Sequence, residues 1–467
     1  MTKQIACVAF LFCAATALSA QTFSTLVNFD FTNGSMPESM PVQGTDGNFY
    51  GTTLQGGAFA SGTVFKMTPG GTLTTLYTFC SQANCIDGET PEVGLTLAPD
   101  GNFYGTTLGG GAQFEGTAYR VTPKGSLAIL YSFCSQTNCS DGYGPRAVPI
   151  EGVDGNFYGT TLYGGAYGDS FENNYGTVFK MTPEGMLTTL HSFDGTDGSG
   201  PTGLVQATDG SFYGTTESDG LYGYGTVFKI TPQGTLTTLY NFCSESGCTD
   251  GKEPTGGMVQ ASDGDYYGTT SEGGANNEGT VFKITAGGML ATLHSFDNID
   301  GALPNGLMQA TDGNFYGTTF DGGAHAYGTV FEIKAGGALT TLHSFDNTDG
   351  SHPGAGVSQS TSGLLLGTTL DGGTNAEGTV FSLSVGLGPF IQTIPTVGRV
   401  GNNITILGND LKGSTAVSFN GTAATTFTAS NTAIKVTIPV GATSGTVEVT
   451  TATGNILRSN VPFRVAP

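Results

Sequence analysis

The side chains that could do chemistry in this chain are its cysteines, its histidines and a few grouped acids. Six cysteines form three pairs with identical spacing: Cys80 and Cys85, Cys134 and Cys139, Cys243 and Cys248. Each pair lies between a Phe and an Asp-Gly, and related segments without cysteine cover the same interval with four fewer residues. In an oxidising compartment each pair would close its own loop as a disulfide. A metal site is the weaker alternative, because two cysteines with no nearby His supply too few ligands.

The histidines follow the pattern of a packing position. Three of them occupy one repeated place that Tyr holds elsewhere: His191, His294 and His343, against Tyr77, Tyr131 and Tyr240. Placement on separate repeat units would keep these rings apart, and His325 and His352 are isolated in the sequence. We therefore predict no metal or catalytic role for them.

The acids offer two further chemical hypotheses. Asp169 and Glu172 share the longest variable loop and could act as an acid–base pair, although a solvated loop is the simpler interpretation. The segment 297–301 resembles a calcium loop faintly, but it lacks the alternating acids and the closing Glu, so we interpret it as a turn. The sequence thus predicts no catalytic residue, no metal and no cofactor. The non-consensus charges are Arg120, Arg146, Lys252 and Glu253, and the sequence does not place them relative to one another.

Aromatic side chains that break the repeat are the candidates for ligand contact. Most of the 30 Phe and 18 Tyr fall at repeated positions, which predicts a buried core. The exceptions lie in variable loops: Phe59, Phe114, Tyr167, Phe171, Tyr175, Tyr222, Tyr224 and Tyr327. Exposed on one rim, such rings could stack on sugars or contact a protein, and local loop packing is the alternative.

A tandem repeat positions all these residues. The motif Asp-Gly-Asn-Phe-Tyr-Gly-Thr-Thr, or a close variant, occurs seven times at steps of 49 to 55 residues. In each unit an Asp-Gly turn and a second Gly-containing turn separate Val-, Thr- and aromatic-rich runs, which indicates a four-stranded antiparallel meander. We name its strands a to d in chain order. Such units, repeated with periodic Gly and aromatic residues, predict an all-β propeller rather than an open solenoid.

The two ends of the repeat region support a closed ring. The last unit stops after strand c (residues 378–384), and an unpaired strand d precedes the first unit (residues 23–30). If that strand completes the last sheet, residues 21–385 form seven blades with no free edge. The a–b and c–d turns then lie at one end of the ring, and the variable b–c loops and d–a crossovers lie at the other. Function is expected at the variable end.

Composition limits the class of partner. The net charge is −22 with 11% charged residues, which argues against nucleic acid and anionic membranes. Residues 1–20 combine Lys3, an apolar run and a small-residue exit, as in a signal peptide, and no second run of spanning length follows. We expect a secreted, extracellular monomer, with the cell surface or the periplasm as alternative locations.

The period ends before residue 389. Residues 389–467 contain short Val-, Ile- and Thr-rich runs split by Gly and Asn turns, which indicates a small β-sandwich. The segment resembles the immunoglobulin-like IPT/TIG family in Pro395, Gly398 and Gly401, in ITILGNDL, VSFNG and IKVTIPVGATSGTVEV, and in Phe463. That resemblance implies a spacer or adhesion module without catalytic residues.

The repeat region is similar to the bacterial GloVer, or choice-of-anchor, repeat proteins. The residues that carry the similarity are the seven units of the form DGNFYGTT…GG…GTVFKITP…GxLTTLYSF. The resemblance implies export and repeats rather than a particular reaction. The Gly-Gly after strand b also resembles kelch propellers, although the chain has no Trp.

Two functions fit these observations. The first is a non-catalytic binding or structural protein that presents its variable loops to an extracellular polysaccharide or protein. The alternative is a polysaccharide lyase or hydrolase with its site on the same face. Acids grouped with Arg or His from different blades would favour the enzyme. An aromatic rim without such groups would favour binding.

Overall fold

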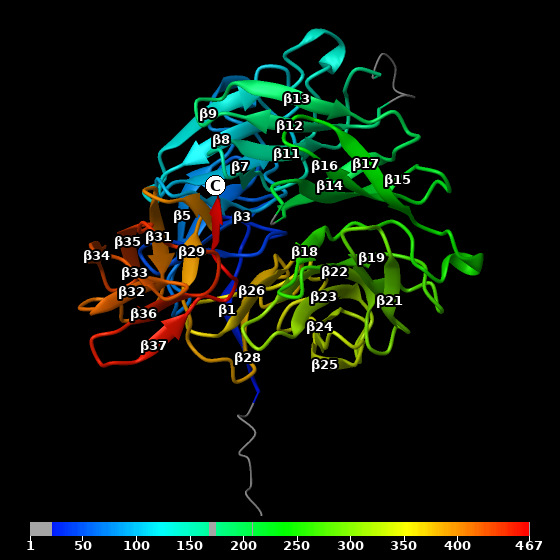
Figure 1. The fold of residues 1–467 in the computed structure, drawn as a ribbon. Coiled ribbons are helices and arrows are strands. Elements are labelled where there is room, and N and C mark those ends of the chain that lie inside the picture. The colour runs from blue at the N-terminus through cyan, green and yellow to red at the C-terminus, as the bar shows by residue number, and fades with distance from the viewer. Residues whose placement is uncertain (1–20, 168–173, 208, 467) are drawn as a thin grey trace, which may run out of the picture.

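The computed structural model describes residues 21–167, 174–207 and 209–466 (Figure 1). Seven four-stranded antiparallel sheets are arranged as blades of a ring, and a β-sandwich follows. The predicted all-β architecture is confirmed. The expected signal peptide (residues 1–20), Phe171, Asp169 and Glu172 lie outside the described residues. The described part of the chain contains no helix with the length and hydropathy needed to span a bilayer.

Each blade consists of strands a to d in order from the centre outward. The strands of blades 1 to 3 are β2 (Val42–Gln43), β3 (Phe49–Thr53), β4 (Thr63–Met67), β5 (Leu73–Thr78), β6 (Thr96–Leu97), β7 (Phe103–Thr107), β8 (Thr117–Val121), β9 (Leu127–Ser132), β10 (Ile150–Glu151), β11 (Phe157–Thr161), β12 (Thr177–Met181) and β13 (Leu187–Ser192). Those of blades 4 to 6 are β14 (Ser199–Gln206), β15 (Phe212–Ser218), β16 (Thr226–Ile230), β17 (Leu236–Asn241), β18 (Met258–Gln260), β19 (Tyr266–Thr270), β20 (Thr280–Ile284), β21 (Leu290–Ser295), β22 (Ala302–Gln309), β23 (Phe315–Asp321), β24 (Thr329–Ile333) and β25 (Leu339–Ser344).

The first strand of the chain closes the ring, as predicted. Blade 7 contains β26 (Ser358–Gln359), β27 (Leu365–Thr369), β28 (Thr379–Ser384) and, as its strand d, β1 (Thr22–Asn28). Strand β1 runs antiparallel to β28, with Phe23 opposite Leu383 and Asn28 opposite Thr379. Joining segments more than 350 residues apart removes both free sheet edges.

The hydrophobic core lies between neighbouring blades. Tyr158 of blade 3 stacks on Phe212 of blade 4 with 4.1 Å between ring centroids, and equivalent pairs recur around the ring. Within each blade the Gly of the repeated motif leaves room for a strand-c ring: a Cβ added at Gly159 would lie 2.5 Å from Cζ of Phe179. The Phe-Tyr-Gly part of the motif is therefore explained by packing.

The Asp of the same motif organises the a–b turn. In blade 3 its carboxylate, Asp154, accepts hydrogen bonds from the backbone N–H and side-chain amide of Asn156 and from the Tyr158 hydroxyl. Lys180 Nζ completes the group at 2.6 Å. These bonds, led by the one from Lys180, more than offset the effect of burial and lower the pKa of Asp154. The most repeated residues of the chain thus serve the fold.

One blade carries a buried polar atom without a partner. Tyr119 takes the strand-c place that Phe holds in the other six blades, and its side chain is fully buried. Within the described part of the chain its hydroxyl makes no hydrogen bond. We expect Tyr119→Phe to increase the free energy of unfolding by about 1 kcal/mol, because it removes an unpaired buried donor. Urea unfolding measures this, and the reverse change Phe65→Tyr in blade 1 should destabilise the protein.

The C-terminal sandwich packs against the ring. Its strands are β29 (Gln392–Ile394), β30 (Val397–Arg399), β31 (Asn403–Leu407), β32 (Ala416–Phe419), β33 (Thr422–Ala423), β34 (Phe427–Ala429), β35 (Ala433–Thr437), β36 (Val447–Thr450), β37 (Ile456–Arg458) and β38 (Arg464–Ala466). They form the sheets β29-β31-β35-β34 and β33-β32-β36-β37, with β30 paired to β38.

The sandwich docks on the a–b turns. Thr432 donates to the Thr45 carbonyl of blade 1, Asn409 donates to Thr361 of blade 7, and Arg464 donates to the Ala207 carbonyl of blade 4. Leu407 joins a core cluster with Tyr50 and Phe103. Figure 1 shows the C-terminal strand lying over blade 1, beside β3 and β5. The sandwich therefore covers the end that carries the a–b turns, which we call the turn end, and leaves the variable end open.

Candidate functional site

The d–a crossovers hold one backbone position that adopts a left-handed conformation in every blade. The residue before the crossover proline has φ between 52° and 60° in all seven: Met36, Thr90, Gly144, Gly200, Glu253, Leu303 and His352. Its N–H donates to the blade before, as from His352 to the Tyr327 carbonyl at 2.9 Å. A non-glycine residue pays about 1 kcal/mol or more for this left-handed conformation. The position is thus fixed by the fold, while its side chain differs between blades.

The residue after the same proline varies as much. Around the ring it is Glu38, Glu92, Arg146, Thr202, Thr255, Asn305 and Gly354. The first three lie on consecutive blades and converge. Arg146 Nε lies 2.6 Å from Oε1 of Glu92, and Arg146 Nη1 lies 3.9 Å from Oε2 of Glu217 at the end of β15. We call Glu38, Glu92, Arg146 and Glu217 the mouth cluster, and we call the part of the variable end where the crossovers of the seven blades meet the mouth.

Glu38 differs from the other members of the mouth cluster. Its carboxyl makes no hydrogen bond or ion pair with the residues that the structure describes. Burial, together with the nearby charge of Glu92, raises its pKa to about 7, and Arg146 offsets this only in part. A carboxyl that titrates near neutrality and is free of protein partners can donate or accept a proton or hydrogen bond from a ligand.

Further charged groups surround the mouth on blades 5 to 7. Lys252 Nζ lies 2.6 Å from Glu272 Oε2 and 5.5 Å from the centre of the Tyr224 ring. His352 lies between two carboxylates, with Nε2 3.5 Å from Asp321 and Nδ1 3.4 Å from Asp371. Acids therefore outnumber cations around the mouth.

The predicted rim aromatics separate into exposed and packed rings. Phe59, Phe114, Tyr167 and Tyr222 are 52%, 59%, 52% and 47% exposed. They lie on the b–c loops of blades 1, 2, 3 and 4, the blades that supply the mouth cluster. The corresponding loops of blades 5 to 7 carry Asn or His at their tips instead.

The remaining predicted rings contact the protein. Tyr224 is 37% exposed and lies under Lys252. Tyr175 and Tyr327 are partly buried and pack against cores between blades. Tyr327 also lies 5.9 Å from the His352 ring. Local packing, the alternative interpretation, describes these two.

The repeated His and Tyr position makes a hydrogen bond as well as packing contacts. His191, His294 and His343 each contact the Asp of the following crossover at 2.6 to 2.8 Å. Where Tyr stands instead, its hydroxyl donates to the matching Asp at 2.7 Å. Tyr precedes the three crossovers with cysteines, and His precedes three of the four without. These groups tie strand d to the crossover and do not converge on the mouth.

The cysteine pairs are disulfides, as predicted. Cys80–Cys85, Cys134–Cys139 and Cys243–Cys248 each close a loop around a short 3₁₀ turn: η1 (Ala83–Cys85), η2 (Thr137–Cys139) and η3 (Ser246–Cys248). Glu89 lies beside the first pair, but oxidised sulfurs are not metal ligands there. In the segment 297–301, Asp297 accepts backbone N–H groups and Asp300 contacts His294, as expected for a turn.

The sequence did not place the non-consensus charges relative to one another, and the structure brings acids together with Arg146. Sequence reasoning named Arg146, Lys252 and Glu253 but missed Glu38, Glu92 and Glu217. Aligning the repeats on the crossover proline would have exposed the first two, because that column alone reads Glu, Glu, Arg. Arg120, the fourth non-consensus charge, lies in β8 opposite Tyr104, away from the mouth cluster.

Comparisons with solved structures support the fold. Virginiamycin B lyase from Staphylococcus aureus is 13% identical with a TM-score of 0.52, covering 78% of this chain and 99% of its own. A fungal alcohol oxidase of the AA5 family is 12% identical with a TM-score of 0.50, covering 94% and 98%. The extracellular domain of a hybrid two-component system from B. thetaiotaomicron gives 12% and 0.51, covering 93% and 53%. At such identities the likeness concerns the fold alone.

Sequence comparison identifies both parts of the chain. No curated protein matches it. The family model of the Gloeobacter/Verrucomicrobia repeat matches residues 14–171 and 148–381, and the IPT/TIG domain matches residues 389–465. The chain therefore belongs to the Gloeobacter/Verrucomicrobia repeat family and carries an IPT/TIG domain after its propeller.

Proposed function

We propose that this protein is an extracellular binding protein whose ligand is a polysaccharide held at the variable end, across blades 1 to 4. One observation carries the proposal: the blades that bring the mouth cluster together also carry the four most exposed rings among the described members of the predicted set. Carboxylates and a guanidinium hydrogen-bond sugar hydroxyls, and aromatic faces stack on the apolar faces of sugar rings. The disulfides fit an oxidising, extracellular environment.

A second candidate is a polysaccharide-active enzyme at the same place. Glu38 supports it, because a carboxyl titrating near neutrality beside a second carboxyl group suits general acid–base chemistry. In that case Glu38 would give a proton to the leaving oxygen of the glycosidic bond. Glu92, oriented by Arg146, would take a proton from the water that attacks the anomeric carbon. The gathering of acids with Arg from different blades is the feature that favours this candidate.

A glycan-array screen of residues 21–467, followed by mass spectrometry of each hit, tests both candidates. We expect Tyr222→Ala and Phe114→Ala each to weaken binding of a hit about tenfold, since stacking on one ring contributes about 1 to 2 kcal/mol. Met289→Ala is the matched control, because Met289 is 74% exposed at the turn end. Shortened glycans that disappear with Glu38→Gln would establish the enzyme. Absence of any hit, or equal losses in all three variants, would refute a glycan site at this face.

A further inference from the structure

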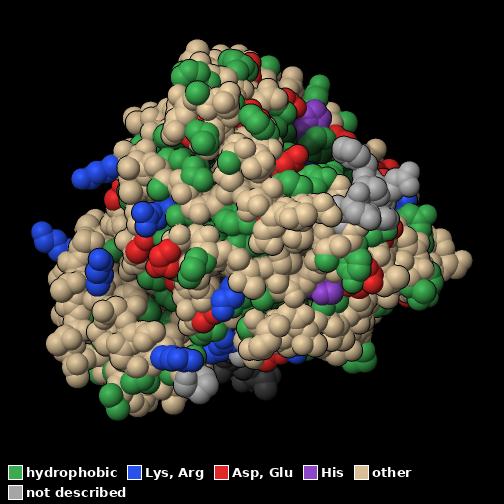
Figure 2. Space-filling model, turned by 90° about the horizontal axis from the view of Figure 1, so that it is seen from above, with side chains coloured by type: hydrophobic (Ala, Val, Ile, Leu, Met, Phe, Trp, Pro, Cys, Tyr) green, Lys and Arg blue, Asp and Glu red, His purple; other side chains and the backbone are tan. Residues whose placement is uncertain are grey.

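The charge of the chain is divided unequally between its two parts. The propeller, residues 21–388, has 35 acids and nine Lys or Arg, whereas residues 389–467 have five Lys or Arg and two acids. The small domain is therefore basic on a strongly acidic protein. Figure 2 shows Lys and Arg side chains mainly on the left of that view, the side on which Figure 1 places the IPT/TIG strands.

Two of the five cations of the IPT/TIG domain are held by the protein. Arg458 pairs with Glu448 at 2.9 Å, and Arg464 donates to the Ala207 carbonyl. Arg399, Lys412 and Lys435 make no side-chain hydrogen bond or ion pair within the described residues. Unpaired cations on a domain that carries few acids can interact with an external anion.

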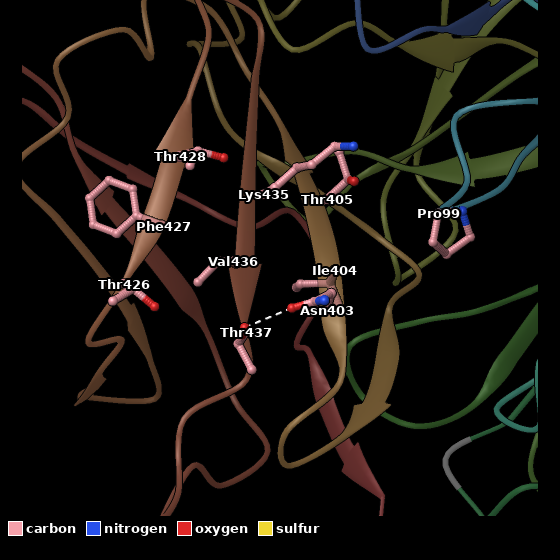
Figure 3. A pocket seen from close by; sticks show the side chains of 10 residues that line it. All are labelled: Pro99, Asn403, Ile404, Thr405, Thr426, Phe427, Thr428, Lys435, Val436 and Thr437. Atoms are coloured by element: carbon pink, nitrogen blue, oxygen red, sulfur yellow. Dashed lines mark hydrogen bonds between the residues drawn. The ribbon is translucent and has the colours of Figure 1, made fainter.

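Lys435 stands in a groove between the two domains (Figure 3). The floor is the outward face of β31, β35 and β34, where Lys435 lies in one cross-strand row with Thr405 and Thr428. Pro99 of the blade 2 a–b turn forms the opposite wall, and Thr405 is only 4% exposed. Figure 3 shows the Lys435 side chain extending over Thr405 on the side of the groove that faces Pro99.

The neighbouring row supplies further polar groups. Asn403 and Thr437 lie opposite each other, and the Thr437 hydroxyl donates to Asn403 Oδ1 at 2.6 Å. That bond leaves the Asn403 amide free to face a ligand, and Thr426 lies beside them in the groove. One ammonium among hydroxyl and amide donors suits an oxygen anion embedded in a hydroxylated chain.

We propose that this groove binds an acidic polysaccharide, with Lys435 contacting a carboxylate or sulfate of the chain. The occupant follows from charge complementarity: the acidic propeller repels polyanions elsewhere, and the groove offers a single cation rather than a continuous basic track. Duplex DNA, with one charge per about 1.7 Å, needs such a track. The site lies at the turn end and does not depend on the proposed function of the variable end. Bound there, a polyanion would leave the variable end facing away.

Binding of residues 21–467 to polygalacturonate, dextran sulfate, neutral dextran and duplex DNA at low salt tests the proposal. We expect affinity for at least one acidic glycan, none for dextran, and a salt slope that Lys435→Gln reduces by about one. The polygalacturonate and dextran sulfate arms distinguish a carboxylate from a sulfate ligand.

Lys334→Gln is the matched control for this test. Lys334 is an exposed propeller lysine, in the turn after β24, whose ammonium has no hydrogen-bond or ion-pair partner among the described residues. The Lys334→Gln substitution removes one positive charge outside the groove and should leave the affinity for the acidic glycan unchanged. Equal losses in both variants, tighter binding to DNA, or no binding to either acidic glycan would overturn the proposal. Both positions are exposed, so thermal unfolding should stay within about 0.5 kcal/mol of the parent and exclude misfolding as the cause.

Discussion

Gly159→Ala is expected to lower the free energy of unfolding by about 3 kcal/mol. The new Cβ would lie 2.5 Å from Cζ of Phe179, whose ring is fully buried between blades 2 and 3. The backbone at Gly159 is extended, so the penalty comes from overpacking alone. The ring has no free volume to enter, because the same core holds Phe157 and, from blade 2, Phe133, whose ring centroid lies 5.4 Å from that of Phe179. Urea unfolding followed by near-ultraviolet circular dichroism measures the change.

Gly203→Ala is the matched control for this substitution. Gly203 also lies in a strand, β14, but no heavy atom lies within 4 Å of the added Cβ. Without the clash, alanine should be neutral or stabilise by about 0.5 kcal/mol through reduced chain entropy in the unfolded state. If Gly159→Ala were as stable as Gly203→Ala, packing would not explain the repeated Gly. The double variant Gly159→Ala/Phe179→Leu should lose less unfolding free energy than the two single variants together, because the smaller Leu side chain leaves room for the new Cβ.

The repeat made the ring predictable from the sequence. Seven copies of one motif fixed the blade, and the lone first strand fixed the closure, since only a ring pairs residues 23–30 with residues 378–384. The Tyr158–Phe212 stack and the Gly159 contact show why these residues recur: each blade uses them to pack against the next blade. A residue that recurs in every unit therefore indicates a packing contact that every blade makes.

The mouth cluster was not predicted, because its residues do not repeat from blade to blade. Glu38, Glu92 and Arg146 sit in the least regular part of each unit and differ between blades, so no periodicity marks them. Their meeting depends on the closeness of a strands around the axis, which is a property of the closed ring. The same holds for the docking of the IPT/TIG domain. Nothing in residues 389–467 indicates that Thr432 and Arg464 reach blades 1 and 4, because such contacts depend on a surface that exists only after the ring has formed.

Two glutamates with the same raised pKa allow stability and function to be separated. Glu38 lies at the mouth, and Glu151 lies in β10 near the turn end, where five other blades have Gln. Four of those glutamines accept a backbone N–H from the preceding blade's turn, as Gln359 does from Thr311 at 3.1 Å. The turn facing Glu151 has Pro99 in that place, which lacks the donor. Burial, then the charges of Asp100 and Asp154, raise the pKa of Glu151 to about 7.

Both Glu38→Gln and Glu151→Gln are expected to stabilise the protein at high pH. A carboxyl whose folded-state pKa is raised contributes stability below its unfolded pKa of 4.5, and this contribution is lost as the pH rises through about 7. The amide does not titrate. Each variant should therefore match the parent near pH 4.5 and exceed it by up to about 3 kcal/mol at pH 8. Urea unfolding across this pH range measures the difference.

Glycan binding should distinguish the two variants. If the mouth holds the ligand, Glu38→Gln raises stability at pH 8 but weakens glycan binding, whereas Glu151→Gln raises stability and leaves binding unchanged. A carboxylate kept unpaired at a cost in stability is what a functional site requires, because the ligand supplies the missing partner. Equal stabilisation with binding retained in both variants would confine Glu38 to a structural role and remove the mouth cluster from the site. If neither variant gained stability between pH 4.5 and pH 8, the raised pKa values themselves would be wrong, whatever the glycan result.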